Sequence, residues 1–552
     1  MLGQKEKQFT TRVISLDELV PRDNFYRQLE AKLDFSFVYD LVKGCYASSM
    51  GRPSIDPVVF FKLQLIMLFE GIRSERQLME LVNLNLAYRW YIGYDLDEPV
   101  PDHSSLSKIR DRYGLVVFQR FFECIVELCQ TAGLVWGQEL YFDGTKTRAN
   151  AALERTVPRW YWEAKHHLRA LFAEEHPASP TKMAPAESES PAPAPVQPGL
   201  AQLVEKYDGT RRSGRRSATY QRVADSKVSP TDPDASPMSR FLGDRAKLGY
   251  HTHYVVDGGK ARIILAALVT PASIMDHTPM LDLTCWVRWR WQLQPKIAVG
   301  DTKYGTVENI VGLAQQGIQG YLPTPDLSQR NGLYPAQDFH YNQLHDLYLC
   351  PQGYELPLHA RRKSEAVFVY RADAATCNTC PVKMHCTNSQ SGRHIFRSFY
   401  QDYLDQAAAY RTTQAYQKAL RKRLVWVEPL FGEAKQWHNM VRFRLRGLQK
   451  VNIEGVLKAA GQNIKRFLNC NNWWNPKYPA GGALLWPCIF LMPLPTAGLL
   501  LTKDFFNTLE ASTTLEKLEK RHYGALWFRQ GFLMATKAQK GSFLIHNLDS
   551  PT

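Results

Sequence analysis

The run Glu-Leu-Tyr-Phe-Asp-Gly at residues 139–144 predicts a short apolar strand that ends at a carboxylate, Asp143. The run Lys-Ile-Ala-Val-Gly-Asp at residues 296–301 repeats this pattern and ends at Asp301. A third carboxylate, Glu428, lies in the helix-like segment Arg-Lys-Arg-Leu-Val-Trp-Val-Glu at residues 421–428. Two carboxylates at strand ends and one on a helix can converge on a pair of divalent ions, and oxygen ligands favour Mg²⁺ or Mn²⁺. A single Asp at a strand end is more often a turn or cap residue, so the prediction depends on all three side chains meeting.

The segments around these carboxylates predict a mixed sheet. Residues 251–256 and 261–270 are strand-like, and the turn Asp257-Gly-Gly259 between them is typical of a β-hairpin. A helix at 278–291, a strand at 296–299, a helix at 307–316 and a strand at 319–323 follow. We therefore expect an α/β fold with helices on both faces of a mixed sheet and a ligand site at the carboxyl ends of the strands.

The first third of the chain has the start signals of several helices. Asp56 and Pro57 are typical of an N-cap and a first helical residue, and they predict a helix that stops near Gly71. Ser74-Glu-Arg-Gln77 opens a second helix with capping-box spacing. Asp102-His-Ser-Ser105 caps a third at residues 106–113, and a long helix at 116–132 follows. The capped third helix displays Lys108, Arg110 and Arg112. The pattern predicts a helix-turn-helix module for DNA, and the alternative is a helical bundle with a solvated charged face.

Composition points to an anionic partner. The chain has 552 residues, enough for three or four domains, and its 45% hydrophobic and 22% charged residues are typical of globular proteins. The formal net charge of +15 favours nucleic acid or a lipid surface, the alternative being a basic enzyme without a polymer ligand. An acidic pocket in so basic a chain indicates phosphodiester chemistry on nucleic acid.

The segment around Glu428 is the most basic part of the chain. Residues 411–450 contain ten Lys and Arg against two acids, whereas a solvated helix normally mixes both signs. This density favours a phosphate backbone as the ligand. Arg421, Glu428 and Lys435 are spaced by seven and are predicted to share one helical face, with Glu433 on another. Further predicted DNA contacts are Arg423, Arg442, Arg444 and Arg446.

Four of the ten cysteines are grouped: Cys350, Cys377, Cys380 and Cys386. Cys377-x2-Cys380 has the spacing of a zinc knuckle, and four thiolates are enough for a closed structural Zn²⁺ site. His385 is a spare candidate ligand. The alternative is free cysteines in a small subdomain.

Other segments bear on the setting of the protein. The Pro-, Ala-, Ser- and Glu-rich residues 175–200 predict a flexible insertion, and we expect ordered sequence to resume near Lys247. Residues 483–501 carry no charge, but three prolines in them argue against a membrane span. No secretory signal opens the chain, so we expect a reducing cytoplasmic setting without membrane attachment.

Taken together, these motifs resemble the DDE transposases of bacterial insertion sequences, in the broad IS4/IS5 grouping and most like the IS1182 family. The resemblance covers about residues 10–470. The residues that carry it are Gly51-Arg-Pro-Ser-Ile-Asp-Pro57, Asp102-His-Ser-Ser105, Tyr141-Phe-Asp-Gly-Thr145, Gly249-Tyr250, Val299-Gly-Asp-Thr302, Val427-Glu-Pro-Leu-Phe-Gly432 with Lys435, Arg444-Leu-Arg-Gly-Leu448, and Asn463 with Lys465.

The resemblance implies an RNase H-like catalytic domain whose DDE triad maps to Asp143, Asp301 and Glu428. It also implies an N-terminal domain that recognises the terminal inverted repeats of the element, and a Cys-bearing insertion before the Glu428 helix. The chain departs from the related Tyr-x2-Arg-x3-Glu-x6-Lys signature, because Arg421 and Leu424 stand where Tyr and Arg belong. The role of that cation then falls to Arg421 or Arg423.

The predicted organisation has five parts. They are a helical DNA-binding domain (1–135), an RNase H-like core (136–324) with a disordered insertion at about 175–235, a Cys-rich insertion (325–400), a segment with the Glu428 helix and basic residues (401–470), and a C-terminal tail without a recognisable motif (471–552).

The sequence thus predicts a DNA transposase that cuts at the ends of its element with Mg²⁺ or Mn²⁺ and transfers the strand to target DNA. We expect a homodimer on double-stranded DNA, in the bacterial cytoplasm at the nucleoid. Two alternatives remain: a catalytically inactive DNA-binding protein derived from a transposase, and an RNase H-like nuclease without strand transfer.

Overall fold

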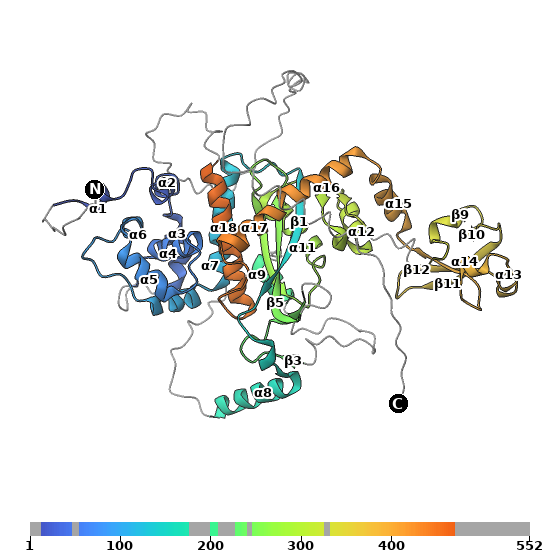
Figure 1. Ribbon diagram of the computed structural model, residues 1–552, viewed down its shortest axis with the longest axis horizontal. Helices are drawn as coiled ribbons and strands as arrows, with labels where there is room; N and C mark the ends of the chain where they lie inside the picture. The colour runs from blue at the N-terminus through green and yellow to red at the C-terminus, as the bar shows by residue number, and fades with distance from the viewer. Residues whose placement is uncertain are drawn as a thin grey trace, which may run out of the picture. The chain divides into compact units, whose positions relative to one another are not determined.

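The computed structural model describes residues 13–46, 54–175, 199–207, 227–239, 245–324 and 332–469 (Figure 1). The predicted tail at 471–552, which contains the charge-free stretch 483–501, lies outside these residues. Most of the predicted insertion lies outside them as well.

Part of that insertion is nevertheless folded. The helix α9 spans Leu200–Lys206, and its side chains Leu200, Leu203 and Val204 are buried. The expectation that ordered sequence resumes only near Lys247 is therefore wrong. Three apolar residues at positions i, i+3 and i+4 fall on one helical face, and that face packs into the core.

Helices form the N-terminal part of the described chain, and their starts follow the predicted caps. The Asp56 side chain accepts hydrogen bonds from the N–H groups of Val58 and Val59, and the Ser74 and Asp102 side chains cap in the same way. The helices are α1 (Leu16–Leu19), α2 (Phe25–Lys32), α3 (Phe37–Val42), α4 (Pro57–Phe69), α5 (Glu75–Leu84), α6 (Leu86–Ile92) and α7 (His103–Thr131).

The helix α7 contains both of the helices predicted at 106–113 and 116–132. Gly114 divides it, with φ 63° and ψ −177°. Only glycine adopts this conformation readily, so the break has a local cause in the sequence.

The main sheet is mixed. Its strand order is β4-β5-β1-β7-β8, and β6 also pairs with β5. The strands are β1 (Glu139–Arg148), β4 (Ser236–Met238), β5 (Lys247–Asp257), β6 (Ile264–Pro271), β7 (Ile297–Val299) and β8 (Gln319–Tyr321). Strand β1 runs antiparallel to β5 and parallel to β7, β8 runs parallel to β7, and β5 and β6 form the predicted hairpin.

The helix α18 (Leu448–Asn469) closes the outer edge of β6. Asn452 accepts a hydrogen bond from the Val269 N–H and donates one to the Val269 carbonyl, at 2.8 and 2.9 Å. Asn463 makes the same pair of bonds to Ile264, both at 2.9 Å. Eleven residues of helix and five residues of strand each span about 16.5 Å, so the two asparagines match the two strand positions.

Two side contacts fix the position of α18. A Cβ added to Gly455 would lie 2.7 Å from the Val269 side chain, and one added to Gly461 would lie 2.0 Å from the Leu68 side chain. The helix therefore approaches β6 and α4 so closely that any larger residue at these positions would force the Val269 and Leu68 side chains to move. It also packs along α7, and the two helices lie side by side in Figure 1.

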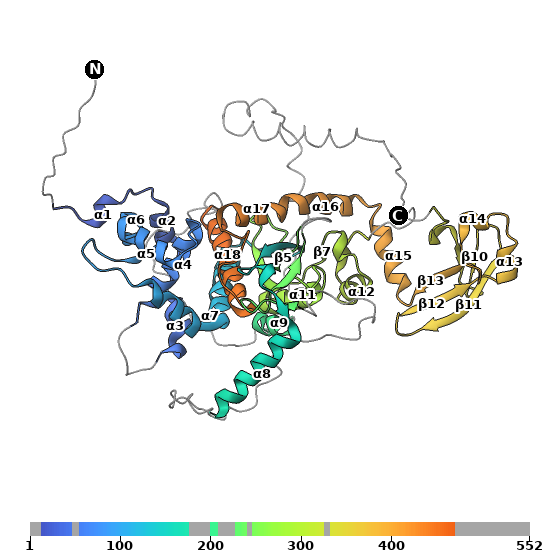
Figure 2. The ribbon, with the colours of Figure 1, turned by 60° about the horizontal axis from the view of Figure 1, so that its bottom comes forward.

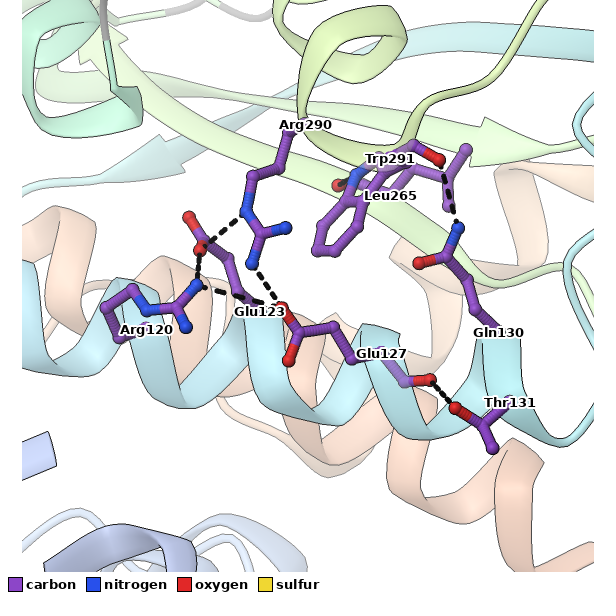
Figure 3. A network of polar contacts seen from close by, with 8 residues as sticks. All are labelled: Arg120, Glu123, Glu127, Gln130, Thr131, Leu265, Arg290 and Trp291. Atoms are coloured by element: carbon purple, nitrogen blue, oxygen red, sulfur yellow. Dashed lines mark hydrogen bonds and ion pairs between the residues drawn. The ribbon is translucent and has the colours of Figure 1, made fainter. Parts of the chain in front are cut away.

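A polar network joins α7 to α11 (Met280–Trp291), as Figure 3 shows. Arg290 pairs with Glu123 at 2.8 Å and also with Glu127, and the Gln130 amide donates to the Trp291 carbonyl. The Trp291 indole N–H donates to the Leu265 carbonyl at 2.9 Å. Leu265 is the extra residue of a bulge in β6, so this bond satisfies a carbonyl that the strand ladder leaves open.

The remaining helices follow the sheet strands. They are α8 (Arg159–Glu175), α12 (Val307–Gln315), α15 (Gln401–Tyr410), α16 (Gln414–Trp426) and α17 (Glu428–Trp437). A short ladder joins β2 (Val157–Pro158) to β3 (Lys227–Val228). No helix within the described residues is both long enough and apolar enough to cross a membrane.

A second, smaller sheet contains the grouped cysteines. It is antiparallel, in the order β13-β12-β11-β10-β9, and it has its own small core around Tyr348, Leu356 and Tyr370. Its elements are β9 (His340–Asn342), β10 (Leu347–Leu349), β11 (Glu355–Arg362), β12 (Val367–Arg371), β13 (His394–Ser398), α13 (Ala374–Asn378) and α14 (Lys383–Cys386).

Replacing Asn463 with Ala should lower the free energy of unfolding by about 2–4 kcal/mol, because a buried backbone N–H and a buried carbonyl lose their partners. Urea unfolding measures this. The exposed Gln449 on the same helix is the matched control, and its replacement with Ala should change stability by less than about 0.5 kcal/mol. Equal effects of the two substitutions would contradict the edge-sealing role.

Candidate active site

Asp143 and Asp301 occupy corresponding positions on neighbouring strands. Tyr141 of β1 pairs with Val299 of β7 in a parallel register, and each aspartate lies two residues further on. The two carboxylates therefore leave the sheet at the same level. Asp143 accepts a hydrogen bond from the Gly144 N–H at 2.9 Å, and Asp301 accepts one from the Lys303 N–H at 2.8 Å.

The Arg423 side chain connects Asp143 to Glu428. One guanidinium nitrogen of Arg423 lies 3.3 Å from an Asp143 oxygen, and the other lies 3.7 Å from a Glu428 oxygen. Arg423 is buried, and the Asp143 side chain is only 14% exposed, whereas the Glu428 side chain is half exposed. The third carboxylate thus comes within reach of the first, although the two residues lie far apart in the chain.

The electrostatics of Asp143 reflect all of these neighbours. Burial raises the pKa of Asp143 from 3.8 to about 6, although the positive charge of Arg423 and the Gly144 N–H act in the opposite direction. The negative charges of Asp301 and Glu428 raise the pKa further. A buried carboxylate next to two others is a position that a cation would stabilise.

Glu428 opens a helix and does not continue one. α16 ends at Trp426 and α17 begins at Glu428, with Pro429 in its first turn. The two helices follow one another in Figure 2. The expectation that Arg421, Glu428 and Lys435 share one helical face is therefore wrong, because the heptad spacing holds only along an unbroken helix.

The break separates the two flanking cations. Lys435 is on α17 and lines a hollow that is also lined by Gly144. Arg421 is on α16 and lines a different groove, together with Trp136 and Trp426. The competing carboxylate, Glu433, pairs with Arg466 at 2.9 Å and with His438 at 3.5 Å. Burial raises the pKa of Glu433, but His438 and Arg466 outweigh burial and hold it at about 2, so Glu433 has a structural role.

Two of the predicted DNA contacts pair with one carboxylate, Glu75, and one of the two is buried. Arg110 is buried and pairs with Glu75, and Arg444 pairs with the same carboxylate at 3.0 Å. Burial gives Arg110 a structural role in place of the predicted contact with DNA, whereas the Arg444 side chain is partly exposed and its DNA contact stays a prediction. Their shared partner, Glu75, lies far from both in the sequence.

Other predicted contacts remain on the surface. Lys108, Arg112, Arg442 and Arg446 are exposed. Arg442 donates to the Asn150 side chain at 2.7 Å, and Arg446 donates to the Asn150 carbonyl at 3.0 Å. Backbone bonds from Arg148 to Val441 and from Phe443 to Arg148 hold this basic segment at the end of β1.

One residue of the site was missed by the sequence analysis. Asp276 is buried and contacts His251 at 3.0 Å and Lys303 at 2.5 Å. Burial raises the pKa of Asp276, but His251 and Lys303 lower it by more, so the carboxylate stays charged. A Cβ added to Gly144 would lie 3.5 Å from Asp276, which places this network beside Asp143. The only local signal was a single acid in an otherwise uncharged segment after β6.

The four grouped cysteines line one cavity of about 110 Å³. The Tyr354 N–H donates to the Cys350 sulfur at 3.3 Å. Burial raises the pKa of the Cys386 thiol, and the other three cysteines raise it further. The exposed His385 is not among the cavity-lining residues.

Neither the three carboxylates nor the four cysteines are arranged as a complete metal site. Across the described part of the chain, no three His, Cys, Asp or Glu side chains are grouped closely enough to hold a metal ion as they stand. The side chains of both sets would have to turn towards a common centre.

Two family models match the chain. One is described as Transposase domain (DUF772) and covers residues 14–112, and the other as Transposase DDE domain and covers residues 349–468. The second contains Glu428, whereas Asp143 and Asp301 lie between the two matched regions. No curated protein and no solved structure matches the chain. The two matches indicate a DDE transposase family, and the DDE domain supports an enzyme that acts on DNA.

Replacing Asp143 with Asn should stabilise the protein by about 1–3 kcal/mol at pH 8 in EDTA. Below pH 3.8 Asp143 is protonated in both the folded and the unfolded state, so the substitution has no electrostatic effect there. Between 3.8 and about 6 the unfolded chain releases a proton that the folded chain keeps, and above about 6 the folded chain carries the full cost of a buried charge.

Urea unfolding at pH 5 and pH 8 measures this difference. The exposed Asp97 provides the matched control, since its replacement with Asn should have no such pH-dependent effect. A D143N variant that is no more stable than the parent at pH 8 would contradict the burial of this charge.

Proposed function

We propose that the protein is a DNA transposase that cuts at the ends of its own mobile element and joins the freed ends to target DNA. One observation carries the proposal. Asp143, Asp301 and Glu428 come from distant parts of the sequence, yet the charges of the other two act on Asp143, and Arg423 contacts both Asp143 and Glu428. The two family matches give the same reaction class.

The sheet supports an RNase H-like core. Strands β6, β5 and β1 are antiparallel to one another in turn, and β7 and β8 then run parallel to β1. This order puts two strand ends with carboxylates side by side, which is the position where open α/β sheets bind ligands.

The donor chemistry of the site fits Mg²⁺ or Mn²⁺. All three candidate ligands are carboxylates, which are the ligands these ions prefer, and the raised pKa of Asp143 is the property that a bound cation would reverse. The ions, when bound, supply charge stabilisation for the attacking and leaving oxygens of an in-line displacement.

The reaction that we propose has two steps of the same kind. A water oxygen attacks phosphorus at the element end, loses its proton, and the leaving 3′ oxygen gains one as its bond to phosphorus breaks. The freed 3′-hydroxyl then attacks phosphorus of a target phosphodiester and loses its proton, a new P–O bond joins the element end to the 5′ side of the target, and the target 3′ oxygen leaves and gains a proton as its bond to phosphorus breaks. Lys435 and Arg423 lie within or beside the site, where they can position phosphate oxygens.

Exposed cations outside the site extend the proposed DNA contact. Lys108 and Arg112 would bind from the N-terminal helices, and Arg442 and Arg446 from the segment beside β1. Arg421 lies in its own groove with Trp136. We propose that the N-terminal helices read the terminal inverted repeats and that two copies of the chain hold the two element ends.

Replacing Asp143 or Asp301 with Asn, or Glu428 with Gln, should abolish metal-dependent cleavage of DNA that carries the element ends, with a loss of at least about a thousandfold. Binding of the same DNA in EDTA should stay within a few-fold of the parent protein. The exposed Glu308 on α12 provides the control, and E308Q should cleave normally.

The outcome separates the alternatives. Cleavage by all three variants at the parental rate would refute the triad. A parent protein that binds element ends but never cuts them is the inactive DNA-binding derivative. Cutting without joined products in the presence of target DNA indicates a nuclease without strand transfer.

We also propose that Cys350, Cys377, Cys380 and Cys386 bind a structural Zn²⁺. All four line one small cavity, and the Tyr354 N–H that points at the Cys350 sulfur suits a thiolate acceptor. The mutual effect of the cysteines on the Cys386 pKa means that a nearby cation would favour their thiolate forms.

The full-length protein should contain about one zinc per chain after purification and dialysis, measured by elemental mass spectrometry. Replacing Cys380 with Ser should remove it, because a closed site needs four ligands. Cys285 is exposed on another helix, and C285S should keep the zinc. Protein that stays free of zinc after incubation with Zn²⁺ would contradict the proposal.

A further inference from the structure

A strongly basic hollow lies next to Asp143 and Asp301, because Gly144, the residue after Asp143, and Lys303, two residues after Asp301, line it. It has a volume of about 550 Å³. Six cations line it: Lys146, Arg148, Arg245, Lys247, Lys303 and Lys435. Asp276 is the one acid among the described residues that line it.

Each element that carries a carboxylate also contributes a cation to this hollow. Strand β1 contributes Lys146 and Arg148 beyond Asp143, and the turn after β7 contributes Lys303 two residues beyond Asp301. Helix α17 contributes Lys435, two turns beyond Glu428. The hollow and the acidic site are therefore built on the same framework.

Asp276 does not neutralise the hollow. Its two oxygens are already engaged, one by His251 at 3.0 Å and the other by Lys303 at 2.5 Å. The carboxylate instead fixes the Lys303 ammonium group at the edge of the acidic site. Lys146, Arg148, Arg245 and Lys247 also line the hollow and add positive charge to it.

Within the described residues, no carboxylate forms an ion pair with Lys146, Arg148, Arg245 or Lys247. Lys146 donates to the Ser239 carbonyl at 2.6 Å, and Arg148, Arg245 and Lys247 are exposed. Cations gathered in this way repel one another, and the arrangement is stabilised by a ligand that carries several negative charges.

The spacing of these cations suits a chain of phosphates. Lys146 and Arg148 are two residues apart on β1. They therefore project to the same face of the strand and are about 6.6 Å apart along it. That separation is of the same order as the distance between successive phosphates of one DNA strand. Lysine and arginine side chains on such a wall contact backbone oxygens, which carry no sequence information.

We propose that this hollow binds the sugar-phosphate backbone of DNA, irrespective of base sequence, next to the phosphodiester that meets the carboxylates. The inference rests on the proposed function for the identity of the polyanion. In this proposal Lys146, Arg148, Arg245 and Lys247 contact the DNA strand. The Asp276–Lys303 ion pair lies at the boundary between the basic hollow and the acidic site.

The test uses the full-length protein in EDTA, with fluorescence anisotropy on an element-end duplex and on an unrelated duplex of equal length. Replacing Lys146 and Lys247 together with Ala should weaken binding of both duplexes by the same factor, on the order of tenfold. The slope of log affinity against log salt concentration should become shallower by about 2, because two phosphate contacts are lost.

The matched control is K165A/R169A, which removes the same charge from the exposed face of α8 and should leave the slope unchanged. K247A alone, at an exposed position, should reduce the slope by about 1 if the double variant does not fold. K146R/K247R should retain the parental slope. An unchanged slope in K247A, or an equal loss in the α8 control, would overturn the proposal.

This assay does not require cleavage. If the parent protein never cuts DNA but K146A/K247A shows the shallower salt slope, the proposed role of the hollow is supported and the proposed transposase function is refuted. If the parent protein cuts element ends but K146A/K247A binds DNA with the parental affinity and salt slope, the transposase function is supported and the proposed role of the hollow is refuted.

Discussion

The edge of the main sheet is closed by side chains, and the placement of the other elements follows from that closure. Strand β6 pairs with β5 on one side, and its other side presents buried N–H and carbonyl groups that water does not reach. Asn452 and Asn463 of α18 satisfy these groups at Val269 and Ile264, and Trp291 satisfies the carbonyl of the bulged Leu265. An open edge is both costly when buried and prone to pairing with another chain. These bonds fix the positions of α18 and α11 relative to β6. They therefore also fix the positions of α7, α4 and α17, which pack on those two helices.

The acidic site depends on this frame in a direct way. Asp143 and Asp301 are level because β1 and β7 are parallel neighbours, and that register is a property of the sheet. Glu428 arrives from α17, whose Leu430 carbonyl is bonded to Gln462 of α18. The same helix that seals β6 thus positions the third carboxylate. A site that contains a buried carboxylate with a raised pKa needs such support, because the charge itself opposes folding.

Sequence patterns predicted the features that are local. The caps at Asp56, Ser74 and Asp102, the hairpin at Asp257, and the strands before Asp143 and Asp301 all depend on neighbours within a few residues. The features that failed depend on distant partners or on chain breaks. The burial of Arg110 is decided by Glu75 and Arg444, and the seven-residue spacing around Glu428 lost its meaning where Val427 and Pro429 start a new helix. Asp276 became visible as part of the site only once β5 and the turn after β7 were adjacent in space.

The pairing at Glu75 limits how this chain can evolve by exchange of modules. One carboxylate in α5, Glu75, pairs with Arg110 of α7 and with Arg444 of the segment beside β1, so the helical N-terminal part and the remote basic segment share a counter-charge. A recombinant that took its first hundred residues from a relative without an acid at this position would leave the buried guanidinium group of Arg110 without this partner. Uncompensated charges of that kind cost several kcal/mol. The helical N-terminal part and the segment beside β1 are therefore inherited as one unit.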